Sequence, residues 1–222
     1  MKKILLTTTL LISTTLLFSQ TKYGVKAGVN FASVNIQREQ SNLEGETSSQ
    51  TSFHIGGFAE MGITSKFYFQ PGLTLSGKGY KIKGSKSETV YTLSETESIN
   101  LMYLEVPLTF LTKFSIGPSR FSLGAGPYLG YGISGKQKVT LKFDAPGSDE
   151  DASSSESADL KFGSKTGEVK PFDFGLNLSA GYEIKSGIFV NAGYGFGLNN
   201  ITNKEDTKVK NKVVSISLGY KF

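Results

Sequence analysis

The stretch FDFGLNLSAGY, at residues 172–182, alternates between apolar side chains and polar or small ones. A period of two is typical of a β-strand with one apolar face, whereas an amphipathic helix repeats about every 3.6 residues. Seven further stretches show the same alternation, at residues 23–31, 53–61, 69–75, 102–110, 121–133, 188–196 and 214–222. The sequence therefore predicts an all-β fold of eight strands.

The links between these strands are long and short in turn. Long links cover residues 36–51, 79–98, 136–170 and 199–212, and short links cover residues 63–66, 115–118 and 185–187. An antiparallel up-and-down barrel in a bacterial outer membrane sorts its connections in this way, with short periplasmic turns and long extracellular loops. We therefore expect an eight-stranded transmembrane β-barrel with both termini in the periplasm and the long links on the cell surface.

The two faces of the predicted strands indicate which side contacts lipid. One face carries aromatic residues near the strand ends, such as Tyr23 and Phe31, with aliphatic residues between them, as membrane barrels require. The other face carries Gly, Ser, Asn and a few charges. Because eight strands leave a lumen only wide enough for side chains, Phe58, Tyr103 and Tyr128 on this face predict a filled interior.

Composition excludes several classes of function. The 222 residues include 26 Gly, no Cys and a single His, which excludes cysteine nucleophiles and metal sites built from Cys or His clusters. We expect no cofactor. The net charge of +5, or +3 without Lys2 and Lys3, gives no reason to expect a nucleic-acid partner. These two lysines precede an apolar stretch at residues 4–18, which predicts a signal peptide at residues 1–19 and a barrel domain at residues 20–222.

Four short motifs resemble the PorT-like outer-membrane β-barrel family. They are YGVKAGVNF at residues 23–31, YLEVPL at 103–108, LGAGPYLG at 123–130 and LGYKF at 218–222. The resemblance implies a small barrel in the outer membrane of a Gram-negative bacterium. The founding member of that family is linked to a protein-secretion and surface-attachment system, whereas most members have no assigned task. The resemblance supplies no catalytic motif to map onto the chain, and we expect no enzymatic activity.

Charged residues that point into a barrel lumen are costly unless they are paired, so they are the first candidates for function. The predicted polar network of the lumen comprises Lys26, Glu60, Glu105, Arg120, Tyr128 and Glu183, and Asp173 and Lys221 share the inward face. Antiparallel pairing is expected to bring Lys26 near Glu60 and Arg120 near Glu183. Glu105 is expected to be a buried carboxylate with a hydroxyl or cation as its partner. A plug of ion pairs is the first interpretation, and a gate or proton path is the alternative.

The single histidine keeps a lipid-modifying enzyme open as a weaker alternative. Some outer-membrane enzymes combine His with Ser and a carboxylate, and Ser52 and Glu60 lie close to His54 in the sequence. His54 and Glu60 share a face, but six residues of strand separate them by about 20 Å. Strand geometry therefore argues against this group as a catalytic site.

The third long link is acidic. Residues 144–168 contain seven Asp or Glu and two Lys, and a serine run occupies residues 153–155. This composition predicts a mobile, solvated loop, and cation binding is the alternative.

The last strand ends in Tyr220 and Phe222, which resemble the C-terminal signal that barrel-assembly machinery recognises. The expected partners are therefore outer-membrane lipid, that machinery, and a protein outside the cell or in a secretion system. The predicted role is that of a structural or surface-interaction protein, with a narrow pore for small solutes or ions as the alternative.

Overall fold

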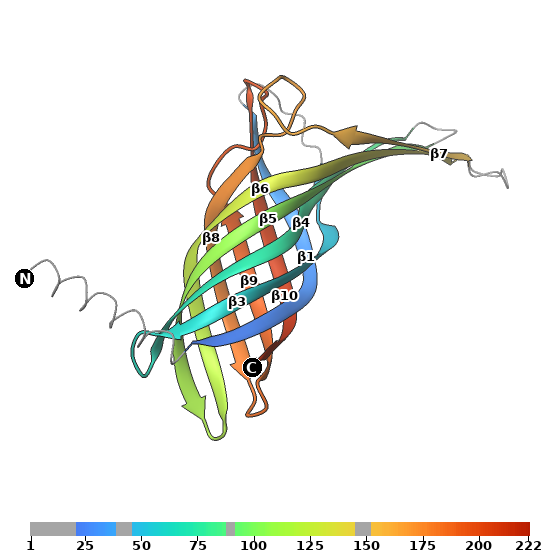
Figure 1. The fold of residues 1–222 in the computed structure, drawn as a ribbon. Coiled ribbons are helices and arrows are strands. Elements are labelled where there is room, and N and C mark those ends of the chain that lie inside the picture. Colours follow the sequence, from blue (N-terminus) through green and yellow to red (C-terminus); the bar gives the residue numbers. More distant parts are fainter. Residues whose placement is uncertain (1–20, 39–45, 88–91, 145–151) are drawn as a thin grey trace, which may run out of the picture.

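The computed structural model describes residues 21–38, 46–87, 92–144 and 152–222, so the predicted signal peptide lies outside the described residues. The strands are β1 (Lys22–Arg38), β2 (Glu46–Ser48), β3 (Gln50–Gly62), β4 (Phe67–Ser87), β5 (Thr92–Ile116), β6 (Ser119–Asp144), β7 (Ala152–Leu160), β8 (Phe172–Glu183), β9 (Ile188–Gly197) and β10 (Thr207–Lys221). Eight of these described strands form a closed antiparallel ring in the order β1–β3–β4–β5–β6–β8–β9–β10, and β10 pairs with β1 (Figure 1). The predicted barrel is confirmed.

The alternation that predicted the strands separates the two faces of the barrel wall. On β3, His54 is 5% exposed, whereas its neighbours Phe53 and Ile55 are 51% and 54% exposed. The exposed side chains of Val25, Leu104 and other large apolar residues cover the outside of the ring. A soluble protein rarely exposes so much contiguous apolar surface, so this belt is the side that contacts lipid. Within the described ranges, no helix is long and apolar enough to cross a bilayer.

The three short links are tight turns at one end of the barrel, called here the turn end. They join β3 to β4, β5 to β6 and β8 to β9. Gly117 and Gly187 take φ angles of 58° and 88° in two of these turns, a conformation that favours glycine. The start of β1 and the C-terminus also lie at the turn end, and the opposite end is called the loop end (Figure 1).

The long links differ from the prediction because much of their sequence is strand. Residues 81–87 of β4, 92–100 of β5, 136–144 of β6 and 152–160 of β7 form a sheet beyond the loop end, called here the projecting sheet. β2 adds to its edge by pairing with residues 81–83 of β4. The predicted mobile loop is wrong for residues 152–160, since every residue of β7 pairs with β6. The pairing of β6 with β8 ends at Tyr131, so the rest of β6 would have an unpaired edge beyond the barrel. β7 pairs with that edge and satisfies its backbone hydrogen-bonding groups.

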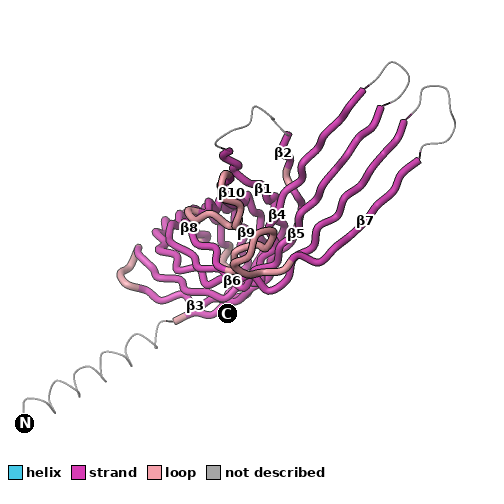
Figure 2. The backbone as a smooth tube through the Cα atoms, turned by 90° about the horizontal axis from the view of Figure 1, so that it is seen from above, coloured by secondary structure: helices cyan, strands magenta, loops and turns pink. Residues whose placement is uncertain are grey.

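Two backbone irregularities lie where the projecting sheet leaves the barrel. Gly79 of β4 has a φ of 147°, and a Cβ atom there would lie 2.0 Å from the carbonyl oxygen of Ile99. In the neighbouring β5, the register with β6 shifts between Met102 and Tyr103, which marks a bulge. Bulges and glycines bend and twist strands. In Figure 1 the projecting sheet leans away from the barrel and is seen nearly edge-on, and in Figure 2 its strands spread out face-on.

Candidate functional site in the barrel lumen

Two clusters of buried charges occupy the lumen. The turn-end cluster consists of Glu60, Lys113, Glu183 and Lys221, from β3, β5, β8 and β10. The Lys113 amine lies 2.5 Å from Glu60 and 3.4 Å from Glu183, and the Lys221 amine lies 3.1 Å from Glu60 and 2.5 Å from Glu183. Gln70 donates a further hydrogen bond to Glu60. Each carboxylate therefore contacts both lysines, and the charges of this cluster balance.

The loop-end cluster is centred on Lys78, which is 3% exposed. Its amine lies 2.5 Å from Glu105 and 2.7 Å from Asp173, and it sits 4.1 Å from the centre of the Tyr128 ring. The Tyr128 hydroxyl and the Asn211 amide both donate to the same Asp173 oxygen. Glu105 is thus a buried carboxylate with a cation as its partner.

Lys26 and Arg120 do not form the predicted ion pairs. Lys26 faces Gly56 in the β1–β3 register, and Glu60 faces Lys22, so the predicted Lys26–Glu60 pair is wrong by four residues. Arg120 does lie opposite Glu183 in the β6–β8 register. Its side chain is nevertheless exposed, and the Glu183 carboxylate contacts Lys113 and Lys221 instead. Strand pairing aligns backbones, whereas inward side chains reach across the lumen to strands that are not neighbours.

The His54 side chain of β3 forms hydrogen bonds with side chains of β1 and β10. Its Nδ1 atom lies 2.8 Å from Asn30 Oδ1, and its Nε2 atom lies 2.8 Å from Ser217 Oγ. The Asn30 amide nitrogen already donates to Ser76 and to the Gly77 carbonyl, so Asn30 Oδ1 accepts from His54. His54 therefore carries its proton on Nδ1, and the Ser217 hydroxyl donates to Nε2. Neither Ser52 nor Glu60 forms a hydrogen bond with the His54 ring among the described contacts. The group of Ser52, His54 and Glu60 considered from the sequence is therefore not assembled.

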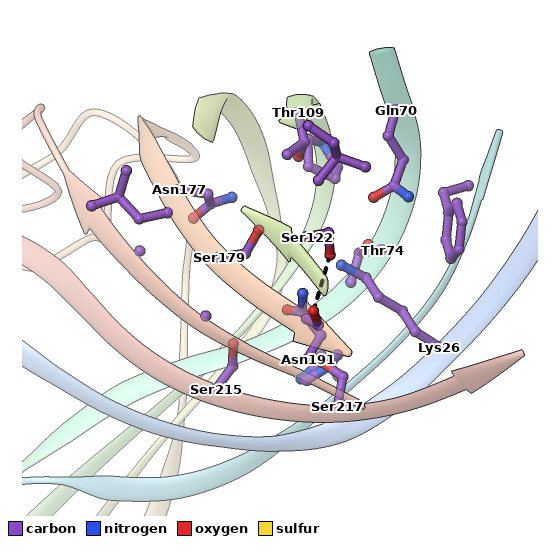
Figure 3. Close-up of a pocket in the computed structure, with 18 of the residues that line it drawn as sticks. Lys26, Gln70, Thr74, Thr109, Ser122, Asn177, Ser179, Asn191, Ser215 and Ser217 are labelled. Atoms are coloured by element: carbon purple, nitrogen blue, oxygen red, sulfur yellow. Dashed lines mark hydrogen bonds between the residues drawn. The ribbon is translucent and has the colours of Figure 1, made fainter. Parts of the chain in front are cut away.

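A cavity of about 120 Å³ lies between the two charge clusters. Hydroxyl and amide side chains line much of its wall, including Ser122, Ser179, Asn177 and Asn191. In Figure 3 the Lys26 side chain extends from β1 into this space. Within the lumen of the described structure, Lys26, Lys78, Lys113 and Lys221 face the carboxylates of Glu60, Glu105, Asp173 and Glu183, so the charges sum to zero.

An apolar cap closes the lumen at the loop end. Its buried members are Val34, Ile99, Leu101, Tyr103, Ile201 and Val209, and Leu160, Phe162 and Val169 pack against them. The segments that precede β8 and β10 supply several of these residues and bond to each other, because the Lys170 amide donates to the Ile201 carbonyl and the Asn203 side chain to the Gly163 carbonyl. The cap and the two charge clusters therefore obstruct the lumen at three levels, and the cavity lies between the two clusters.

Lys78 and Lys113 are absent from the predicted lumen network because two of the predicted strands end at residues 75 and 110, before these lysines. Lys78 lies two residues after the buried Ser76 and therefore on the same face. Lys113 lies four residues after Thr109 on the same parity. A lysine does not fit the pattern of apolar and small residues by which these strands are recognised. Lys78 and Lys113 can therefore be predicted to point inward only by continuing the alternation of inward and outward residues beyond the predicted strand ends.

The lumen belongs to a barrel of a known family. Residues 18–203 match the family described as outer membrane protein beta-barrel domain. The chain belongs to this family. It is accordingly an outer-membrane protein that sits in membrane lipid, as its exposed apolar belt requires. No curated protein matches the chain in sequence.

Solved structures with the same kind of fold are distant. The attachment invasion locus protein Ail of Yersinia pestis is 13% identical with a TM-score of 0.35, over 91% of this chain and 99% of its own. Neisserial surface protein A is 17% identical with a TM-score of 0.39, over 90% of this chain and 97% of its own. The N-terminal barrel domain of Pseudomonas aeruginosa OprF is 12% identical with a TM-score of 0.27, over 91% of this chain and all (100%) of that domain. These similarities concern the fold alone.

Proposed function

We propose that the protein is a non-enzymatic surface-interaction protein whose filled barrel anchors the projecting sheet beside the membrane. The observation that carries this proposal is the contrast between the two parts. The lumen is filled by paired charges and capped by apolar residues, whereas the projecting sheet extends four paired strands beyond the barrel. The strands have more length than a bilayer requires, since nine to eleven residues suffice to cross it.

The projecting sheet has two chemically different faces. Its upper face continues the lumen-facing side of the strands, on which Ile99 is buried. This face carries Ile82, Val139 and Leu141, with Glu95, Glu97 and Glu156 among them. Leu141 is 42% exposed. A partner that fits this face has an apolar patch bordered by basic groups.

We infer that the loop end lies outside the cell, where a secretion-system protein or another extracellular protein can reach the upper face. The alternation of short turns and long extensions supports this orientation. The PorT-like resemblance favours a partner from a secretion or attachment system. Orientation is tested by placing a single Cys at Ser154, since the chain has none, and labelling intact cells with a membrane-impermeant maleimide. Labelling only after the outer membrane is opened would reverse the orientation.

The partner surface is tested by photo-crosslinking in intact cells. Leu141 and Thr140 are adjacent on β6 and point to opposite faces of the projecting sheet, so a photoreactive amino acid at each gives a matched pair. We expect a crosslinked protein adduct from position 141 and not from position 140. Equal adducts from both positions, or none from either, would reject the upper face as the partner surface.

The absence of enzymatic activity is tested at Ser217. Ser217, His54 and Asn30 form a hydrogen-bonded row that resembles an activated serine, yet these side chains are 4%, 5% and 2% exposed within a filled lumen. A fluorophosphonate probe reacts with serines that a base activates and a substrate can reach. We expect no labelling of the folded protein, and labelling that disappears in Ser217→Ala would show that it is an enzyme.

A further inference from the structure

The lower face of the projecting sheet is basic. It continues the outward side of the strands and carries Lys81, Lys83, Lys136, Lys138 and Lys142. On β6 the lysines alternate with the apolar side chains of the upper face, as a strand with two distinct environments requires. Lys81 lies opposite Ser98, which lies opposite Lys138, so the lysines of β4 and β6 flank a hydroxyl-bearing β5.

The net charge of this face is positive. Its five lysines are accompanied by Asp159 of β7, which lies opposite Lys136, and by two acidic positions at strand ends, Glu46 opposite Lys83 and Asp144 two residues after Lys142. The other described positions of β7 on this face are Ser153, Ser155 and Ser157. On the upper face, Glu95, Glu97 and Glu156 are accompanied by no lysine among the described side chains. The two faces therefore suit ligands of opposite charge.

The basic face begins where the apolar belt ends. On β6, Tyr131 and Ile133 point outward and are 52% and 51% exposed. Lys136 is the first lysine after them, directly beyond the bulge, and Lys138 and Lys142 follow. The end of an apolar belt marks the hydrocarbon boundary, and lipid headgroups occupy the next layer. These lysines thus start at headgroup level.

The projecting sheet is oriented to bring this face to the membrane. A strand that bends away from the barrel axis turns its outward side toward the membrane and its lumen side away from it. Figures 1 and 2 show this bend, because the sheet is edge-on from the side and face-on from above. The lysine face is accordingly the underside of a sheet that lies over the lipid around the barrel.

We propose that the lower face of the projecting sheet binds the phosphate groups of anionic lipid headgroups in the membrane that holds the barrel. Ammonium groups are attracted to an anionic surface within about a Debye length, and the serine and threonine hydroxyls between them donate to phosphate oxygens. This contact would hold the projecting sheet flat and keep its upper face turned to the surroundings. The proposal goes beyond the proposed function, since it concerns the opposite face and holds for either side of the membrane.

The test uses spin labels at adjacent serines. Ser154 and Ser155 are exposed neighbours on β7 that point to the upper and lower faces, and the chain has no Cys to interfere. Each Cys variant is labelled and reconstituted into nanodiscs of phosphatidylglycerol or phosphatidylcholine that contain a nickel-chelating lipid. Heat-modifiable migration on gels confirms that every variant is folded.

In phosphatidylglycerol we expect the nickel lipid to relax the label at position 155 more strongly than the label at 154. The difference should disappear in phosphatidylcholine, in about 1 M salt, which shortens the Debye length to about 3 Å, and in the combined variant Lys136→Gln, Lys138→Gln and Lys142→Gln. Equal relaxation at both positions in phosphatidylglycerol, or a difference that ignores lipid charge, would overturn the proposal. Binding of soluble polyphosphate without any lipid effect would also overturn it and assign the face to a soluble polyanion. Crosslinking at Leu141 reports on the upper face separately, so failure of one proposal is distinguishable from failure of the other.

Discussion

Lys78 is the residue on which the loop-end cluster depends. It contacts both Glu105 and Asp173, and Asp173 is completely buried at 0% exposed. Replacing Lys78 with Met keeps the length of the side chain but leaves two buried carboxylates without their cation. We expect Lys78→Met to lower the free energy of unfolding by about 3–5 kcal/mol, measured by urea unfolding in lipid vesicles.

The matched control for this variant is Lys204→Met, at an exposed lysine outside the projecting sheet, which should change stability by less than about 0.5 kcal/mol. Adding Glu105→Gln to Lys78→Met removes one uncompensated charge and should restore part of the loss. Stability of Lys78→Met equal to that of the unmodified protein would show that the cluster does not hold the lumen together.

Ser217 is a second residue with a buried polar contact, because its hydroxyl donates a hydrogen bond to His54 Nε2. We expect Ser217→Ala to cost about 1–3 kcal/mol of unfolding free energy, since it leaves a buried acceptor without its donor. Ser215→Ala, two residues earlier on the same inward face of β10 and lining the same cavity, is the control and should cost less. Equal losses in the two variants would contradict the hydrogen-bond assignment at His54.

At the scale of the element, β10 closes the barrel by pairing with β1. The Phe222 amide extends this seam by donating to the Tyr23 carbonyl at 3.0 Å, and the Phe222 side chain is 69% exposed. This exposed aromatic is the residue on which the predicted assembly signal depends. We expect deletion of Phe222 to reduce the amount of heat-modifiable barrel in outer membranes, whereas Phe222→Tyr retains it. Unchanged yield after the deletion would reject the assembly role.

The strands that cross the membrane were predictable from the sequence, and those of the projecting sheet were not. Lipid contacts one side of β8 and the lumen the other, so Phe172, Leu176 and Tyr182 alternate with small or polar residues without interruption. In β7 neither face is buried in the protein, and the sequence Ser153 to Glu156 carries no apolar alternation to detect. Its strand conformation comes from its pairing with β6, which a local pattern cannot reveal.

The same distinction explains the partial prediction of the lumen network. Strand parity places Glu60 and Glu105 inside, because a residue two positions along a strand returns to the same face. The cation of Glu105 is Lys78 of the neighbouring β4, but the cations of Glu60 come from strands that do not pair with β3: Lys221 reaches Glu60 from β10, and Lys113 reaches it from β5. Such contacts depend on the diameter and stagger of the closed barrel, which no single strand encodes.

At the scale of the whole molecule, three successive barriers should keep the barrel from conducting ions. The turn-end cluster obstructs one end of the lumen, and the loop-end cluster and the apolar cap obstruct the other. Because the barriers lie in series, removing one leaves the path closed. In planar bilayers we expect no steady conductance from the unmodified protein, from Lys113→Ala with Glu60→Ala, or from Leu101→Ser with Ile201→Ser. The variant that combines these four substitutions with Lys78→Ala, Glu105→Ala and Asp173→Ala should conduct, provided that gel migration shows it folded. Conductance by the unmodified protein would instead establish a pore, and conductance by either double variant would mean that the remaining barriers are not seals.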